Sequence, residues 1–94
     1  MEQIMVRILL ADDHDVVRRG LRDQLSQHSG WEICGEACNG REAVKLASKL
    51  SPDVAVIDLS MPELNGLEAT RQIRKVMPKT EVLIFTMHEN EQLI

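Results

Sequence analysis

The sequence predicts an α/β domain built as a three-layer, doubly wound parallel sheet. Short apolar runs rich in Val and Ile alternate along the chain with segments of helical spacing, which is the pattern of repeated strand–helix units. Two of these runs, Val6 to Leu10 and Val54 to Ile57, are apolar on both faces. Strands have this composition when helices cover both sides of a sheet, so we expect these two strands at its centre.

Two more strands are predicted from their side-chain patterns. In Trp31 to Glu36 mainly apolar residues alternate with mainly polar ones, as in a strand with one exposed face. We therefore expect this strand at an edge of the sheet. Val82 to Phe85 is apolar on both faces. This pattern predicts a covered strand with a neighbour on each side.

Three helices are predicted between the strands, and the first turns of a fourth after the last strand. In the first helix apolar residues recur every four positions, which gives it one apolar face. Asn39 can cap the second helix, with Glu42 reaching back to the cap, and Pro residues end the second and third. The expected helices lie between these pairs of residues: Asp15 and His28, Asn39 and Pro52, Asn65 and Pro78, and His88 and Ile94.

Length and composition exclude several classes of protein. The 94 residues, 44% of them hydrophobic, make one domain at most. A net charge of −4 without a Lys/Arg run argues against nucleic-acid binding by this segment. No stretch approaches the roughly 20 apolar residues of a membrane span, and no signal peptide is recognisable, so we expect a cytoplasmic protein. Cys34 and Cys38 are too few for a disulfide framework and are expected to be buried or incidental thiols.

Acidic residues follow both central strands. Asp12 and Asp13 come directly after the first, and Asp58 comes directly after the second. Because open α/β sheets bind ligands at the carboxyl ends of their strands, the three carboxylates should converge there. Clustered carboxylates raise one another's pKa and call for a cation, and oxygen ligands select Mg²⁺ or Ca²⁺. A carboxylate beside Mg²⁺ is a candidate phosphoryl acceptor.

Three sequence motifs in this order resemble the receiver domains of two-component response regulators. They are Ile8 to His14 (ILLADDH), Val56 to Gly66 (VIDLSMPELNG) and Val82 to Thr86 (VLIFT), and the match covers essentially the whole chain. Within that family the chain is most similar to the NarL/FixJ, or LuxR-type, subgroup, of which Ala11 to His14 and Asn65 to Thr70 are typical.

The resemblance implies a flavodoxin/CheY-like fold with strand order 2-1-3-4, and it implies roles for individual residues. Asp58 would be the phosphoacceptor that receives its phosphoryl group from a histidine kinase. Asp13 would bind Mg²⁺ directly, Asp12 through water, and the backbone carbonyl of Ser60 would be the remaining protein ligand beside Asp58 itself. Thr86 would be the switch hydroxyl that turns to hydrogen-bond the new phosphoryl oxygen.

We also expect particular roles for residues around these positions. Pro62 and Gly66 would shape the loop after the acceptor, with Gly66 in a backbone conformation that a Cβ would resist. Ser60 and Met61 would tune the access of water, and Met87 the access to the phosphate. His14 is expected to be a surface or loop residue rather than a ligand or base, and the Arg18-Arg19 pair a solvated helix face.

The resemblance also implies a fifth strand that carries a Lys and an aromatic switch residue. Neither is found within the 94 residues. We therefore expect residues 1–94 to be a receiver domain truncated at its C-terminus, with the fifth strand and last helix absent and a DNA-binding transcription effector domain downstream in the parent protein. Val82 to Phe85 would then lack a partner strand, so self-association is expected.

The leading function is a phosphorylation-controlled interaction module, an enzyme only toward its own phosphorylation and dephosphorylation. A Mg²⁺-dependent aspartyl-phosphate hydrolase of the haloacid-dehalogenase kind remains an alternative, because Asp13-His14-Asp15 has the Asp-x-Asp spacing of that class. A truncated receiver that acts only as an association module is another. A dinucleotide-binding domain is disfavoured, since it wants a Gly-rich turn where this chain has Ala11-Asp12-Asp13.

Overall fold

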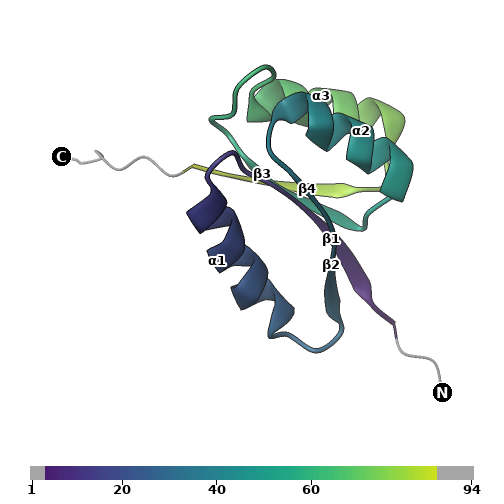
Figure 1. Cartoon of the computed structure of the whole chain (residues 1–94). Helices are drawn as coiled ribbons and strands as arrows, with labels where there is room; N and C mark the ends of the chain where they lie inside the picture. The colour runs from purple at the N-terminus through teal and green to yellow at the C-terminus, as the bar shows by residue number, and fades with distance from the viewer. Residues whose placement is uncertain (1–3, 87–94) are drawn as a thin grey trace.

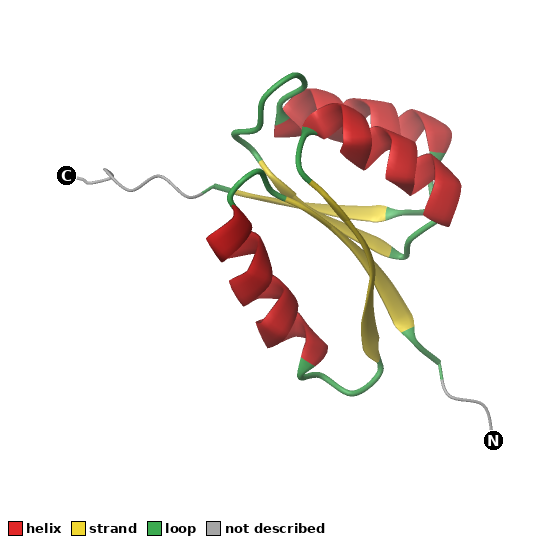
Figure 2. Ribbon diagram, in the orientation of Figure 1, coloured by secondary structure: helices red, strands yellow, loops and turns green. Residues whose placement is uncertain are grey.

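The computed structural model describes residues 4–86 as a four-stranded parallel sheet between two layers of helices (Figure 1). Helix α1 covers one face of the sheet, and α2 and α3 lie side by side on the other (Figure 2). The elements in chain order are β1 (Val6–Ala11), α1 (Asp15–Ser26), β2 (Trp31–Ala37), α2 (Gly40–Leu50), β3 (Val54–Asp58), α3 (Gly66–Val76) and β4 (Glu81–Phe85).

The predicted fold class and strand order are confirmed. The sheet has the order β2-β1-β3-β4, and all three strand pairs are parallel. The central strands β1 and β3 contribute fully buried side chains, among them Leu9, Leu10 and Ile57, because helices lie against both of their faces. β2 is an edge strand, as its alternating pattern predicts.

β4 is an edge strand among the described residues, as the expected strand order 2-1-3-4 implies. β4 pairs with β3 alone, with Ile84 opposite Ile57 in the register. Leu83 is 61% exposed and Ile84 39% exposed, although both faces of this strand were expected to be covered. The apolar pattern records the residues' preference for burial, but no described strand lies beside the outer edge of β4.

The helix limits follow the capping residues. The Asn39 side chain caps α2 by accepting from the Glu42 backbone N–H at 2.8 Å, and Asn65 caps α3 in the same way. Glu42 does not reach back to Asn39 as expected; its carboxylate accepts from the Cys38 backbone N–H, one residue earlier. α1 ends at Ser26, two residues before the predicted limit. The expected helix from His88, and Met87, lie outside the described residues.

The main core lies between the sheet and the α2–α3 layer. Small side chains let the helices approach the sheet closely, and Ala43, Ala47 and Ala69 are all fully buried. On the opposite face α1 has no fully buried residue. The longest described helix has 12 residues, and none of the described helices has the length and apolarity of a bilayer span.

Both cysteines are free thiols. Cys34 is half-buried, and burial raises the pKa of its thiol because the thiolate loses hydration. Cys38 is exposed just before α2.

Candidate functional site

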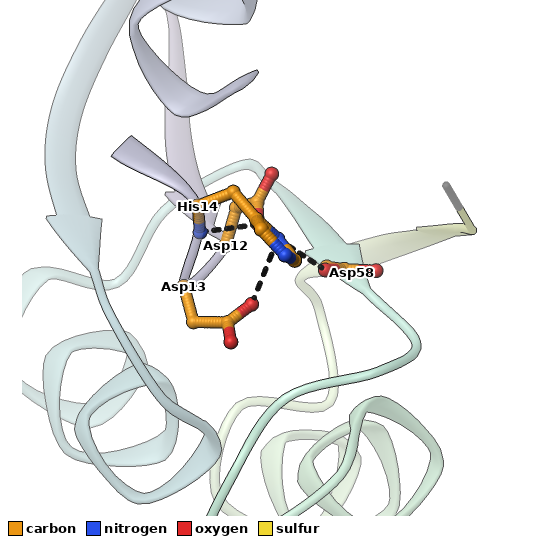
Figure 3. A group of neighbouring side chains, drawn as sticks. All are labelled: Asp12, Asp13, His14 and Asp58. Atoms are coloured by element: carbon orange, nitrogen blue, oxygen red, sulfur yellow. Dashed lines mark hydrogen bonds and ion pairs between the residues drawn. The ribbon is translucent and has the colours of Figure 1, made fainter. Parts of the chain in front are cut away.

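The three acidic residues predicted from the sequence lie together at the carboxyl ends of β1 and β3 (Figure 3). The two strands are parallel neighbours, with Ala11 opposite Ile57, so the residues that follow them meet at one edge of the sheet. One side-chain ligand atom from each of Asp12, Asp13 and Asp58, together with one from His14, lies within 4.8 Å of every other.

Two of these carboxylates are buried, and each has one oxygen without a hydrogen-bond partner among the described residues. Asp12 is 0% exposed and Asp58 is 1% exposed, and the Oδ2 atom of each accepts no hydrogen bond from the described residues. A buried oxygen without a partner is costly, more so when it carries charge. The acidic cluster therefore contains buried carboxylate oxygens without hydrogen-bond partners, which fits a hard divalent cation bound by oxygens.

The surroundings of the Asp58 carboxyl group raise its pKa above the ordinary value. Burial raises its pKa, because a carboxylate removed from water loses hydration, and the charges of Asp12 and Asp13 raise it further. The Ser60 backbone N–H donates to Asp58 Oδ1 at 3.2 Å and acts in the opposite direction. A cation beside this group would favour its ionised form.

The backbone of the loop after Asp58 lies close to the backbone of Asp58 itself. Gly66 donates its N–H to the Leu59 carbonyl at 2.9 Å, and a Cβ at Gly66 would lie 2.5 Å from the Asp58 carbonyl oxygen. Gly66 therefore resists a Cβ, as expected, but the cause is close approach and not an unusual backbone conformation, since its φ is not positive. The left-handed residue of this loop is Glu63, with a φ of 68°, and Pro62 beside it is exposed.

The other residues predicted to belong to the site are Thr86, Ser60 and Met61, and they differ in how far they are buried. Phe85 stands opposite Asp58 in the register of β3 and β4, so Thr86 follows at the same edge of the sheet as the acidic site. Thr86 is exposed. Ser60 is exposed as well, whereas Met61 is buried in the core cluster.

His14 is an exposed loop residue, as expected, and its side chain also contacts the acidic cluster. Its side chain is 58% exposed, yet its Nδ1 atom lies 3.1 Å from Asp13 Oδ1 and 3.2 Å from Asp12 Oδ1. The hydrogen bond with Asp12 and the charge of Asp13 raise the pKa of the imidazole. The position of His14 directly after Asp12 and Asp13 in the sequence is the feature that could have predicted this contact.

Arg18 holds the loop that carries the acidic pair. Its side chain is only 13% exposed, so the expected solvated face is wrong for this residue. The guanidinium donates to the Asp12 backbone carbonyl at 2.7 Å, to Asp15 Oδ1 at 2.8 Å and to Glu36 Oε1 at 3.0 Å. It thereby ties the loop after β1 to α1 and to β2.

Comparison with known proteins gives one consistent family. Residues 8–94 match the family described as response regulator receiver domain. The response regulator GacA of Pseudomonas aeruginosa is 39% identical over 87 residues, which are 93% of this chain and 41% of GacA. The chain therefore spans about two fifths of the length of this curated relative.

Solved structures agree with this match. A LuxR-family two-component response regulator from Aurantimonas sp. SI85-9A1 is 41% identical, with a TM-score of 0.84 over 90% of this chain and 61% of that one. The signal receiver domain of the putative response regulator NarL from Mycobacterium tuberculosis is 32% identical, with a TM-score of 0.86 over 92% of this chain and 69% of that one.

Proposed function

Because the chain belongs to the response regulator receiver domain family, with LuxR-type regulators among its relatives, we propose that it accepts a phosphoryl group on Asp58 from a histidine kinase. The supporting observation is the buried Asp58 carboxylate, whose unpartnered Oδ2 faces two more carboxylates across a pocket suited to a divalent cation. We take residues 1–94 as belonging to one receiver unit.

In the proposed reaction Asp58 supplies the nucleophilic oxygen. A bond forms between this oxygen and the phosphorus of a phosphohistidine as the bond from phosphorus to the histidine nitrogen breaks, which leaves an acyl phosphate on Asp58. Asp12, Asp13, Asp58 and the Ser60 carbonyl would hold Mg²⁺. The ion supplies positive charge against the phosphoryl oxygens.

The proposed output is a change in the surface near the β4 end. Thr86 follows β4 at the edge where Asp58 lies, and its hydroxyl would donate to the new phosphoryl oxygen. A charge-assisted hydrogen bond contributes roughly 1.5–3 kcal/mol, enough to bias a loop with two conformations. A relative from Staphylococcus aureus is described as a DNA-binding response regulator of the LuxR family. By analogy, we propose that a downstream domain of the parent protein binds DNA and that this segment does not.

The hydrolase alternative loses its main support. That class needs both acids of an Asp-x-Asp motif at the reacting centre, and Asp13-His14-Asp15 has the spacing. Asp15, however, begins α1, where its side chain is 73% exposed and pairs with Arg18. It is not among the four residues that share the candidate metal site.

Replacing Asp13 with Ala should weaken Mg²⁺ binding by about tenfold or more, because it removes a charged oxygen ligand. Isothermal titration of Mg²⁺, with backbone amide NMR shifts near β1 and β3, would measure the change. Asp23→Ala is the matched control, since Asp23 is an exposed acid on α1 outside the cluster. Equal Mg²⁺ affinity in Asp13→Ala and the parent chain would show that the site is misassigned.

We also propose that the 94-residue chain self-associates through the outer edge of β4. No described strand pairs with this edge, and Leu83 and Ile84 present apolar surface beside its free backbone groups. Such an edge favours pairing with a second strand, and a second copy of β4 offers an identical one.

Ile84→Lys should weaken this association, because a charged side chain at the edge would have to be buried on pairing. Light scattering over a concentration series would measure the average mass. Val76→Lys is the control, as Val76 is an exposed apolar residue at the end of α3 and is not part of β4. A parent chain that stays monomeric at every concentration would refute the proposal.

A further inference from the structure

His14 brings a nitrogen atom into a cluster otherwise made of carboxylates. Its Nδ1 atom lies 3.1 Å from Asp13 Oδ1, 3.2 Å from Asp12 Oδ1 and 4.0 Å from Asp58 Oδ2 (Figure 3). No other described residue places an imidazole or thiol in this group. The candidate ligand set is therefore three carboxylates and one imidazole rather than oxygen alone.

We propose that His14 is a direct metal ligand and that it gives the site a preference for a first-row transition-metal ion such as Mn²⁺ or Co²⁺ over Mg²⁺. Imidazole suits transition metals, whereas Mg²⁺ is bound almost entirely by oxygen. This inference rests on the metal site of the proposed function and specifies which ion that site binds more tightly.

The distances fit a single ion between these side chains. In octahedral coordination with metal–ligand bonds of about 2.1 Å, adjacent ligands lie about 3.0 Å apart and opposite ligands about 4.2 Å apart. The separations from His14 Nδ1 to Asp12 and Asp13 match adjacent positions. The separation to Asp58 Oδ2 is close to that of opposite positions.

The buried oxygens of the same pocket supply an independent observation. Asp12 Oδ2 and Asp58 Oδ2 are buried in side chains that are 0% and 1% exposed, and neither has a hydrogen-bond partner among the described residues. His14 contacts Asp12 through the other carboxylate oxygen, Oδ1. The histidine alone therefore leaves both of these atoms unsatisfied. An ion held beside His14 Nδ1 would satisfy Asp58 Oδ2, which lies 4.0 Å from that nitrogen.

The backbone of His14 holds the ring near the pocket. His14 is the N-cap residue of α1, its carbonyl accepts from the Arg18 N–H at 2.9 Å, and its own N–H donates to Asp12 Oδ1 at 2.9 Å. Ligands fixed by such bonds lose little freedom on binding. To bind a metal, Nδ1 presents its lone pair and the ring proton resides on Nε2.

The test compares metal affinities of the parent chain, His14→Ala and the matched control His28→Ala. His28 is a suitable control because its ring stacks on Trp31, with the ring centroids 4.1 Å apart, and is not part of the acidic cluster. Mn²⁺, Co²⁺ and Mg²⁺ are each titrated by calorimetry. His14→Ala should lose about tenfold or more in Mn²⁺ and Co²⁺ affinity, with Mg²⁺ affinity changed by less than about threefold.

A spectroscopic readout identifies the ligand directly. Pulsed electron paramagnetic resonance of bound Mn²⁺ should detect coupling to an imidazole nitrogen in the parent chain and in His28→Ala, and no such coupling in His14→Ala. Absence of nitrogen coupling in the parent chain would overturn the inference.

A second result would also overturn the inference. If His14 acts only as an internal cation that the metal expels, His14→Ala should bind all three ions more tightly than the parent chain. In both cases loss of Mg²⁺ binding in Asp13→Ala would leave the proposed function standing. If Asp13→Ala binds every ion as the parent does, the site itself is wrong and both proposals fail.

Discussion

Replacing Asp58 with Asn should abolish phosphoryl incorporation from a small acyl-phosphate donor in the presence of Mg²⁺. The Asn amide lacks the anionic oxygen that would attack phosphorus, so the rate should fall by at least about a thousandfold, to background. Intact-protein mass spectrometry over time measures the phosphorylated fraction. Asp23→Asn, which changes an exposed acid on α1, should be phosphorylated at the parent rate.

Loss of folding cannot account for this result, because Asp58→Asn should stabilise the metal-free chain. Burial raises the pKa of Asp58 in the folded state, so its ionised form destabilises the fold at neutral pH. The free energy of unfolding of the parent should fall as pH rises from the unfolded-state pKa through the folded-state pKa, and Asn lacks this dependence. Urea unfolding at acidic and neutral pH would measure the difference. Parent-like phosphorylation of Asp58→Asn would contradict the assignment.

Gly66→Ala should destabilise the fold by about 1–3 kcal/mol. The added Cβ would lie 2.5 Å from the Asp58 carbonyl oxygen and 2.7 Å from the Leu59 Cα atom. Both are backbone atoms, so the strand end that carries Asp58 must move. Mg²⁺ affinity should fall with stability, because the same movement displaces the Asp58 carboxylate.

Gly20→Ala is the matched control for this substitution. Gly20 lies inside α1, and a Cβ there would meet nothing within 4 Å. Alanine is the better helix former, so this variant should gain roughly 0.5–1 kcal/mol. Urea unfolding would measure the free energy of unfolding of both variants. An equal change in the two variants would mean that the close approach at Gly66 does not affect stability.

The fold was predictable from the sequence because apolar residues recur at the positions that each strand or helix buries. Runs that are apolar on both faces identified β1 and β3, and the acids that follow them located the edge of the site. The strand order came from the resemblance to receiver domains and not from periodicity. The apolar pattern of Val82 to Phe85 likewise identified β4, although the pattern alone does not give the number of neighbouring strands, and β4 pairs with β3 alone.

The parts of the site that were missed depend on the direction of single side chains. Nothing in the spacing of His14 or Arg18 distinguishes a ring turned into the cluster, or a guanidinium bound to the Asp12 carbonyl, from solvated side chains. The reason for Gly66 was likewise hidden, because the close approach joins it to Asp58, a residue eight positions earlier in the chain. Such contacts follow from the assembled loops.

Locating the phosphoryl group within the chain tests the central claim most directly. The chain is incubated with Mg²⁺ and an acyl-phosphate donor, the acyl phosphate is trapped by borohydride reduction, and peptides are sequenced by mass spectrometry. The account predicts that the modified position is Asp58 and that chelation of the metal prevents modification. Modification at Asp12, Asp13 or Ser60 in place of Asp58, or modification of Asp58 that is unaffected by chelation, would contradict it.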